Sequence, residues 1–147
     1  MRKAGKIILF LCVIAFISLY LFYARGQAEL VCDKASQVVK DDFIMHIRVE
    51  DLEDGFKVFR SIQYTGDKPV EMKHQTPLVS LSFKNRNHDY TGNHITKTLR
   101  KGSIYHPQKP KTFQDPTPGE YNLYCESAFT VDGKEVAIKL KEKLTFE

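Results

Sequence analysis

The chain has no tryptophan, only three cysteines among its 147 residues, no glycine-rich phosphate loop and no Gly-x-Ser-x-Gly sequence. Without the glycine-rich loop the chain has no phosphate cradle of the nucleotide-binding kind. Without the serine motif there is no nucleophile elbow, so Ser80, Ser82 and Ser103 are not candidate nucleophiles of a hydrolase. The composition therefore argues against an enzyme, and we expect no catalytic residues and no cofactor.

Most of the chain also lacks an excess of charge. The net charge of +4 is accounted for by Arg2, Lys3, Lys6 and Arg25, so the rest of the sequence is formally neutral. A neutral domain does not carry the electrostatic footprint of a nucleic-acid binder. We expect no nucleic-acid partner.

Long hydrophobic runs are absent except for one, which covers residues 7–24 and contains no charged side chain. As a helix this run is roughly 27 Å long, close to the hydrocarbon thickness of a bilayer. Three basic residues precede the run and one follows it, so the positive-inside rule leaves the N-terminus in the cytoplasm. The run predicts a single-pass transmembrane helix with the lipid bilayer as its partner.

This assignment divides the chain into a cytoplasmic N-terminus (1–6), a transmembrane helix (7–24), a tether (25–42) and an extracytoplasmic domain (43–147). The alternative is a signal peptide cleaved near Ala28, because Gly26, Gln27 and Ala28 form a small-x-small site. The length of the run and its terminal Tyr20, Phe22 and Tyr23 favour a retained anchor in a cell membrane. Both interpretations export the same domain.

Two cysteines, Cys32 and Cys125, lie in the exported part. An even pair in an oxidising compartment is consistent with a disulfide bond. The alternatives are two buried thiols, or a disulfide-poor bacterial envelope in which the two cysteines never pair.

Alternating apolar residues dominate the rest of the sequence. They predict strands near 43–50, 56–64, 70–74, 78–83, 95–100 and 103–106, followed by a hairpin over 121–146 that turns at Asp132 and Gly133. Short strands with frequent turn signals and no long helix after the first one indicate an all-β, antiparallel, immunoglobulin-like β-sandwich. The tryptophan and the tyrosine corner typical of antibody domains are absent.

Three segments do not fit the alternation. Residues 33–40 are compatible with either a short helix or an extended segment, and residues 107–119 hold four prolines and are expected to form a loop. Arg60 interrupts the apolar face of its strand, so it needs a partner or an edge position.

Candidate metal and catalytic groups are sparse. Cys125 lies on an apolar strand face, which favours a core residue over a nucleophile paired with histidine. His88, His94 and His106 surround one strand, but their spacing matches no compact metal-binding motif, so we expect loop histidines and no metal.

Basic residues concentrate between residues 84 and 111, where seven bases face one acid. Ordinary solvated charge is one interpretation of this segment. The other is a contact surface for a protein or an anionic envelope polymer, formed by Lys84, Arg86, Arg100, Lys101, Lys109 and Lys111.

Two segments resemble a bacterial family. Tyr64–Val70 (YTGDKPV) resembles a strand-to-turn sequence of small Gram-positive extracytoplasmic immunoglobulin-like domains, and Pro118–Tyr121 (PGEY) with Phe129–Glu135 (FTVDGKE) resembles the strand entry and final hairpin of the same domains. The domain of the Bacillus intracellular proteinase inhibitor family is of this kind. The resemblance implies the fold. It does not imply protease inhibition, because no reactive-loop residues match.

Together these features predict a membrane-anchored extracytoplasmic binding or accessory module. The alternative is a secreted inhibitor or immunity-type protein that blocks a partner through the segment Pro107–Pro118.

Overall fold

The computed structural model describes residues 12–20 and 28–147. Residues 12–20 are helical. The predicted span 7–24 continues beyond them on both sides, onto residues 7–11 and 21–24, which lie outside the described residues. Within the described part of the chain, no helix has both the length and the apolar character needed to cross a bilayer.

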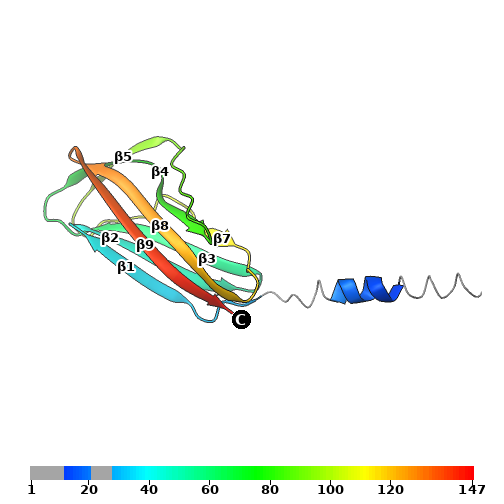
Figure 1. The fold of residues 1–147 in the computed structure, drawn as a ribbon. Coiled ribbons are helices and arrows are strands. Elements are labelled where there is room, and N and C mark those ends of the chain that lie inside the picture. The colour runs from blue at the N-terminus through cyan, green and yellow to red at the C-terminus, as the bar shows by residue number, and fades with distance from the viewer. Residues whose placement is uncertain (1–11, 21–27) are drawn as a thin grey trace, which may run out of the picture.

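In the described part of the chain, nine strands build two antiparallel sheets that pack face to face (Figure 1). The first sheet has five strands: β1 (Lys34–Lys40), β2 (Phe43–Leu52), β3 (Gly55–Tyr64), β6 (Ile104–Tyr105) and β7 (Lys111–Phe113), the last two both pairing with β3. The second sheet has four strands in the order β5 (His94–Leu99), β4 (Val70–Phe83), β8 (Gly119–Val131) and β9 (Lys134–Phe146). The predicted all-β, two-sheet architecture is confirmed.

The core lies between the sheets and follows the alternation of the sequence. In β2, Phe43, Met45, Ile47 and Val49 are buried and the residues between them are more exposed. Strands β3, β8 and β9 repeat this pattern with the buried residues Phe56, Val58, Ile62, Tyr64, Leu123, Cys125, Phe129, Val136, Ile138, Leu144 and Phe146. One apolar face per strand is what a half-buried antiparallel sheet requires.

The C-terminal hairpin is present with the turn at the predicted residues. Val131 pairs with Lys134, so Asp132 and Gly133 alone form the turn. Both have positive φ, +49° and +80°. Positive φ at both central residues is the geometry of a type I′ turn, which matches the twist of the strands it joins.

Strand β4 unites two segments that were predicted as separate strands. It runs without interruption from Val70 to Phe83, but its register against β8 shifts between His74 and Val79. Pro77 lies in this interval and has no N–H to donate to a neighbouring strand. The proline interrupts the ladder locally and leaves the strand continuous.

The N-terminal boundary of the sandwich also differs from the prediction. Residues 34–40, predicted as part of a tether or as a short helix, form β1 and pair with β2 from Lys34↔Val49 to Lys40↔Phe43. Ala28 and Leu30 are buried, and Leu30 bridges to Phe146. The sandwich therefore begins before residue 43, because pairing with β2 and β9 stabilises a segment whose own pattern is indistinct.

Candidate functional site

A groove of about 560 Å³ crosses β1, β2 and β3 and ends at residues 106–110. Its lining includes side chains that alternate with the buried ones, such as His46, Arg48 and Phe59, and these come from neighbouring strands because His46 pairs with Ser61 and Arg48 with Phe59. The guanidinium carbon of Arg48 lies 4.2 Å from the centre of the Phe59 ring. The groove therefore exposes the Arg48 cation stacked on the aromatic face of Phe59.

A second groove of about 640 Å³ lies between β5 and β6. Lys97 and Arg100 line it from the β5 side, and Ile104 and Tyr105 from the β6 side. His106 lines both grooves, so they adjoin at that residue. We call the two together the basic grooves.

The basic grooves contain basic side chains and no acidic one. Their lining includes the cationic side chains of Arg48, Arg60, Lys97 and Arg100, the imidazoles of His46 and His106, and no acidic side chain of the described residues. One of these charges is compensated nearby, since Arg48 forms an ion pair with Glu50 at 2.6 Å. Concave surfaces lined by one sign of charge concentrate ions of the opposite sign.

Arg60 is the least ordinary member of this set. It belongs by alternation to the buried face of β3, and its Nε and Nη1 atoms are buried without a hydrogen-bond partner. Burial lowers the pKa of its guanidinium, while the nearby Cys125 acts weakly in the opposite direction. The sequence predicted that Arg60 needs either a partner or a position at a sheet edge, and the structure gives it the edge position. On the outer side of β3, Arg60 lies between the residues that pair with β6 and those that pair with β7.

The six basic residues proposed as one contact surface do not lie together. Lys84 follows the last residue of β4, whereas Arg100 follows Leu99, which pairs with Val70 at the first residue of β4. The two ends of β4 are about 40 Å apart, because a strand of 14 residues rises about 3.3 Å per residue. Of the six, only Arg100 lines a basic groove.

Most of the others have partners within the domain. Arg86 pairs with Glu126 at 2.8 Å, Lys101 pairs with Asp67, and Lys111 Nζ lies 3.4 Å from the Leu81 carbonyl oxygen. Lys84 Nζ lies 5.1 Å from the centre of the Tyr121 ring, and Lys109 is exposed. The predicted anionic-partner surface is therefore wrong as one continuous patch.

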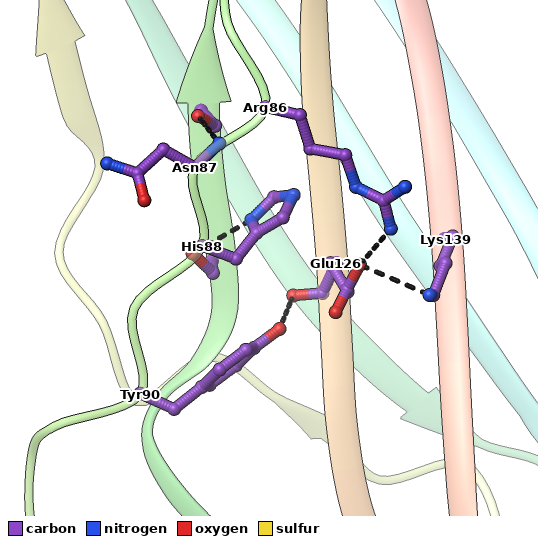
Figure 2. A network of polar contacts seen from close by, with 8 residues as sticks. Arg86, Asn87, His88, Tyr90, Glu126 and Lys139 are labelled. Carbon is purple, nitrogen blue, oxygen red and sulfur yellow. Dashed lines mark hydrogen bonds and ion pairs between the residues drawn. The ribbon is translucent and has the colours of Figure 1, made fainter.

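Arg86 belongs to a polar network that fastens residues 85–90 to the outer face of β4 and β8. Figure 2 shows Arg86 and Lys139 directed at the Glu126 carboxylate, with distances of 2.8 and 3.5 Å. The Tyr90 hydroxyl donates to the Glu126 carbonyl oxygen at 2.8 Å, and His88 Nδ1 lies 3.0 Å from Ser80 Oγ. We call residues 85–90 the strap.

His88 of the strap and Glu126 of β8, to which the strap is attached, both have shifted pKa values. Burial alone would raise the pKa of Glu126, but the Arg86 hydrogen bond and the charge of Lys139 outweigh it and lower the pKa. Burial lowers the pKa of His88, and the attraction of Glu126 only partly offsets this effect. The strap is thus built for an ionised Glu126 and a neutral His88.

Acidification is therefore expected to loosen the strap. Because the pKa of His88 is lower in the folded chain than its ordinary value of 6.5, the unfolded chain binds the proton first. The stability that His88 contributes is present above about pH 6.5 and is lost as the pH falls below it. Urea unfolding of the full chain between pH 7.5 and 5.5 should show a smaller loss of stability in His88→Asn than in the wild type. Parallel curves would contradict this role.

Cys32 and Cys125 are not joined in the structure, and both are free thiols. Val31, the neighbour of Cys32, lies opposite Thr145 of β9, whereas Cys125 pairs with Leu140, so about 13 Å of strand or more separates the levels of the two cysteines. A disulfide requires Cα atoms about 4.4–6.8 Å apart. The predicted bridge is therefore wrong for this fold, and the alternative of two buried thiols holds for Cys125 only, since Cys32 is exposed.

The histidines do not form a metal centre. His88 contacts Ser80, while His94 and His106 are exposed at the two ends of the segment that holds β5 and β6. The described residues contain no group of three or more histidines, cysteines or carboxylates arranged to hold a metal ion.

The segment Pro107–Pro118, proposed as an inhibitory loop, is attached to the domain at three points. Phe113 of β7 stacks on Phe56 with ring centres 5.1 Å apart, and Pro116 is buried. Gln108 accepts a hydrogen bond from the Val79 amide at 3.4 Å and lines the first groove. Most other residues of the segment are exposed.

Sequence reasoning missed His46, Arg48 and Lys97 as groove residues. Each is an ordinary polar residue on the solvent side of an alternating strand, and only the pairing of strands brings them together. Arg60 did carry a signal, because it is the one charged residue on the otherwise apolar face of β3.

Comparison with known proteins identifies no family. No protein-family model matches the chain, and no curated protein matches it either. Among solved structures, the chain is similar to the GAE domain of GGA2p from Saccharomyces cerevisiae, with 8% identity and a TM-score of 0.43 over 75% of this chain and 96% of that one.

Proposed function

We propose that this chain is a membrane-anchored, extracytoplasmic binding module of immunoglobulin-like architecture that has no enzymatic activity and engages an anionic polymer of the cell envelope. The basic grooves would be its contact surface. This location differs from the surface expected from the sequence, but the kind of partner is the same.

The observation that carries the proposal is the composition of the grooves. Two adjoining concavities share His106 and are lined by basic side chains without an acidic one. A flexible polyanion can contact such a surface at several points, and each contact adds a screened attraction. The Phe59 and Tyr105 rings supply apolar surface between the charges.

The anchor and the compartment rest on the sequence. The apolar run 7–24, with three basic residues before it and one after it, supports a single span that carries the C-terminal domain across the membrane. An anionic envelope polymer is available on that side.

The buried thiol of Cys125 favours a binding function for the chain over a catalytic one. Burial raises the pKa of Cys125 to about 12, so this thiol is neutral near pH 7. A neutral, buried thiol is a poor nucleophile.

We expect Lys97→Ser/Arg100→Ser to weaken polymer binding about tenfold, equivalent to about 1.4 kcal/mol. The full chain in non-ionic detergent micelles would be titrated with polyphosphate and with polyglutamate of defined length by calorimetry. Binding should weaken further as salt is added, because exposed charges are screened.

The matched control is Lys141→Ser/Lys143→Ser, which removes the same charge from β9 at the opposite edge of the same sheet. Its affinity should stay within about twofold of wild type, since neither residue lines a groove. Equal weakening by both double variants would show a response to net charge alone. That result, or the absence of binding to either polymer, would contradict the proposed function.

A further inference from the structure

The edge of β3 has a gap beside Arg60. On this edge β6 pairs with Ile62 and Gln63, and β7 pairs with Phe56, Lys57 and Val58. Residues 59–61 lie between these two ladders, and residues 106–110 connect the two short strands past them. The loop residues His106, Gln108 and Pro110 therefore line the same groove as Arg60 at a point where a regular sheet would continue with a strand.

Three donors in this region have no acceptor within the domain. Arg60 Nε, Arg60 Nη1 and Gln108 Nε2 are buried and form no hydrogen bond. The Oε1 atom of Gln108 accepts from the Val79 amide, which orients the amide and leaves its NH₂ group to donate elsewhere. Buried donors are almost always satisfied in proteins, so three in one region need an acceptor from outside the chain, such as a water molecule or a bound anion.

The thiol of Cys125 does not balance the charge of Arg60. Burial lowers the pKa of the Arg60 guanidinium more than Cys125 raises it, and burial raises the pKa of the thiol itself to about 12, so the thiol is neutral near pH 7. The groove that Arg60 and Gln108 both line contains no acidic side chain of the described residues. A cation in partly desolvated surroundings gains most from an anion that also accepts hydrogen bonds.

We propose that Arg60 and Gln108 together form a specific site for one oxyanion group, a carboxylate or a phosphate, at the inner end of the first basic groove. The oxyanion accepts hydrogen bonds from the buried Arg60 nitrogens and from Gln108 Nε2. This inference rests on the proposed function and names the point at which one anionic group of the partner is held. The other basic residues of the grooves attract the polymer without such selection.

The site is tested with small probes that do not need a polymer. Sodium acetate and sodium phosphate would be titrated into the full chain in detergent micelles at constant ionic strength, with sodium chloride as reference. NMR would follow the Arg60 Nε–H and the Gln108 side-chain amide. One of the two oxyanions should shift both signals saturably, and which one does so identifies carboxylate or phosphate as the ligand group. The Nε–H signal of Arg48, whose Nη1 atom is already paired with Glu50, should not shift saturably.

Gln108→Glu is the sharpest variant, because it keeps the acceptor for the Val79 amide and places a carboxylate beside Arg60. It should abolish the saturable shift of Arg60, since the internal carboxylate occupies the site. Arg60→Met, which leaves an apolar side chain on the buried face of β3, should also abolish it. Retention of saturable binding in Gln108→Glu would overturn the site.

The outcomes separate this inference from the proposed function. If neither probe shifts the Arg60 and Gln108 signals more than chloride does, the oxyanion site is wrong even when the polymers bind through Lys97 and Arg100. If a probe binds saturably but no polymer binds, the site stands and the envelope-polymer function is wrong.

Discussion

Replacing Phe56 by alanine is expected to lower the free energy of unfolding by about 3–5 kcal/mol. Phe56 is fully buried, and its ring centre lies 4.9 Å from that of Phe83, 5.1 Å from Phe113 and 5.4 Å from Phe146. These three rings come from three other strands, β4, β7 and β9. Truncation removes buried area and leaves a cavity that side chains on several strands cannot close together.

Phe59→Ala is the matched control for this prediction. Phe59 lies on the same strand but on the opposite face, where it is half-exposed beneath Arg48. We expect it to cost less than about 1 kcal/mol. Urea unfolding of the full chain in micelles would be followed by tyrosine fluorescence, because the chain has no tryptophan. Similar losses for both variants would mean that the aromatic cluster does not organise the core.

Period-two alternation explains why so much of the sandwich was predictable. In β2 the apolar residues alternate from Phe43 to Val49, and in β8 they alternate from Tyr121 to Val131 with Ser127 as the one polar exception. A shift of one residue would move the whole set to solvent, so the sequence determines which face is buried. The turn at Asp132 and Gly133 was equally predictable, since few residue pairs tolerate positive φ at both positions.

The failures came from segments whose structure depends on distant partners. β1 has an indistinct pattern and exists because β2 offers a ladder of seven residue pairs. β7 lies in a proline-rich segment and is held by pairing with β3 and by the contact of Phe113 with Phe56. Local sequence carries no information on either partner.

The candidate site shows the same division. The density of basic residues along the chain predicted a contact surface at residues 84–111. Strand pairing instead places Lys84 and Arg100 at opposite ends of β4. The grooves instead combine residues from β1, β2, β3, β5 and β6 with the segment after β6. Among the groove residues, only Arg60 could be singled out from the sequence, because it is a charged residue at a position where the alternation of β3 predicts an apolar one.

Gly55→Ala is expected to destabilise the domain by about 3 kcal/mol or more, and to disturb the first groove as well. Gly55 begins β3 with φ of +142°, and a Cβ atom there would lie 2.1 Å from the Phe113 carbonyl oxygen. The clash is with backbone, so no side-chain rotation relieves it, and β7 must move away from β3. Because β7 follows residues 106–110 directly, its displacement also moves Gln108 relative to Arg60.

Gly133→Ala separates this packing effect from backbone strain. Gly133 has φ of +80°, but a Cβ atom there meets nothing within 4 Å, so the cost is the conformational one alone, about 1 kcal/mol. Urea unfolding compares the stabilities, and the Arg60 Nε–H signal reports the groove. Gly55→Ala should shift that signal in the folded chain and Gly133→Ala should not. Equal destabilisation by the two variants, with an unchanged Arg60 signal in both, would show that β7 does not need its close approach to Gly55 to hold the groove.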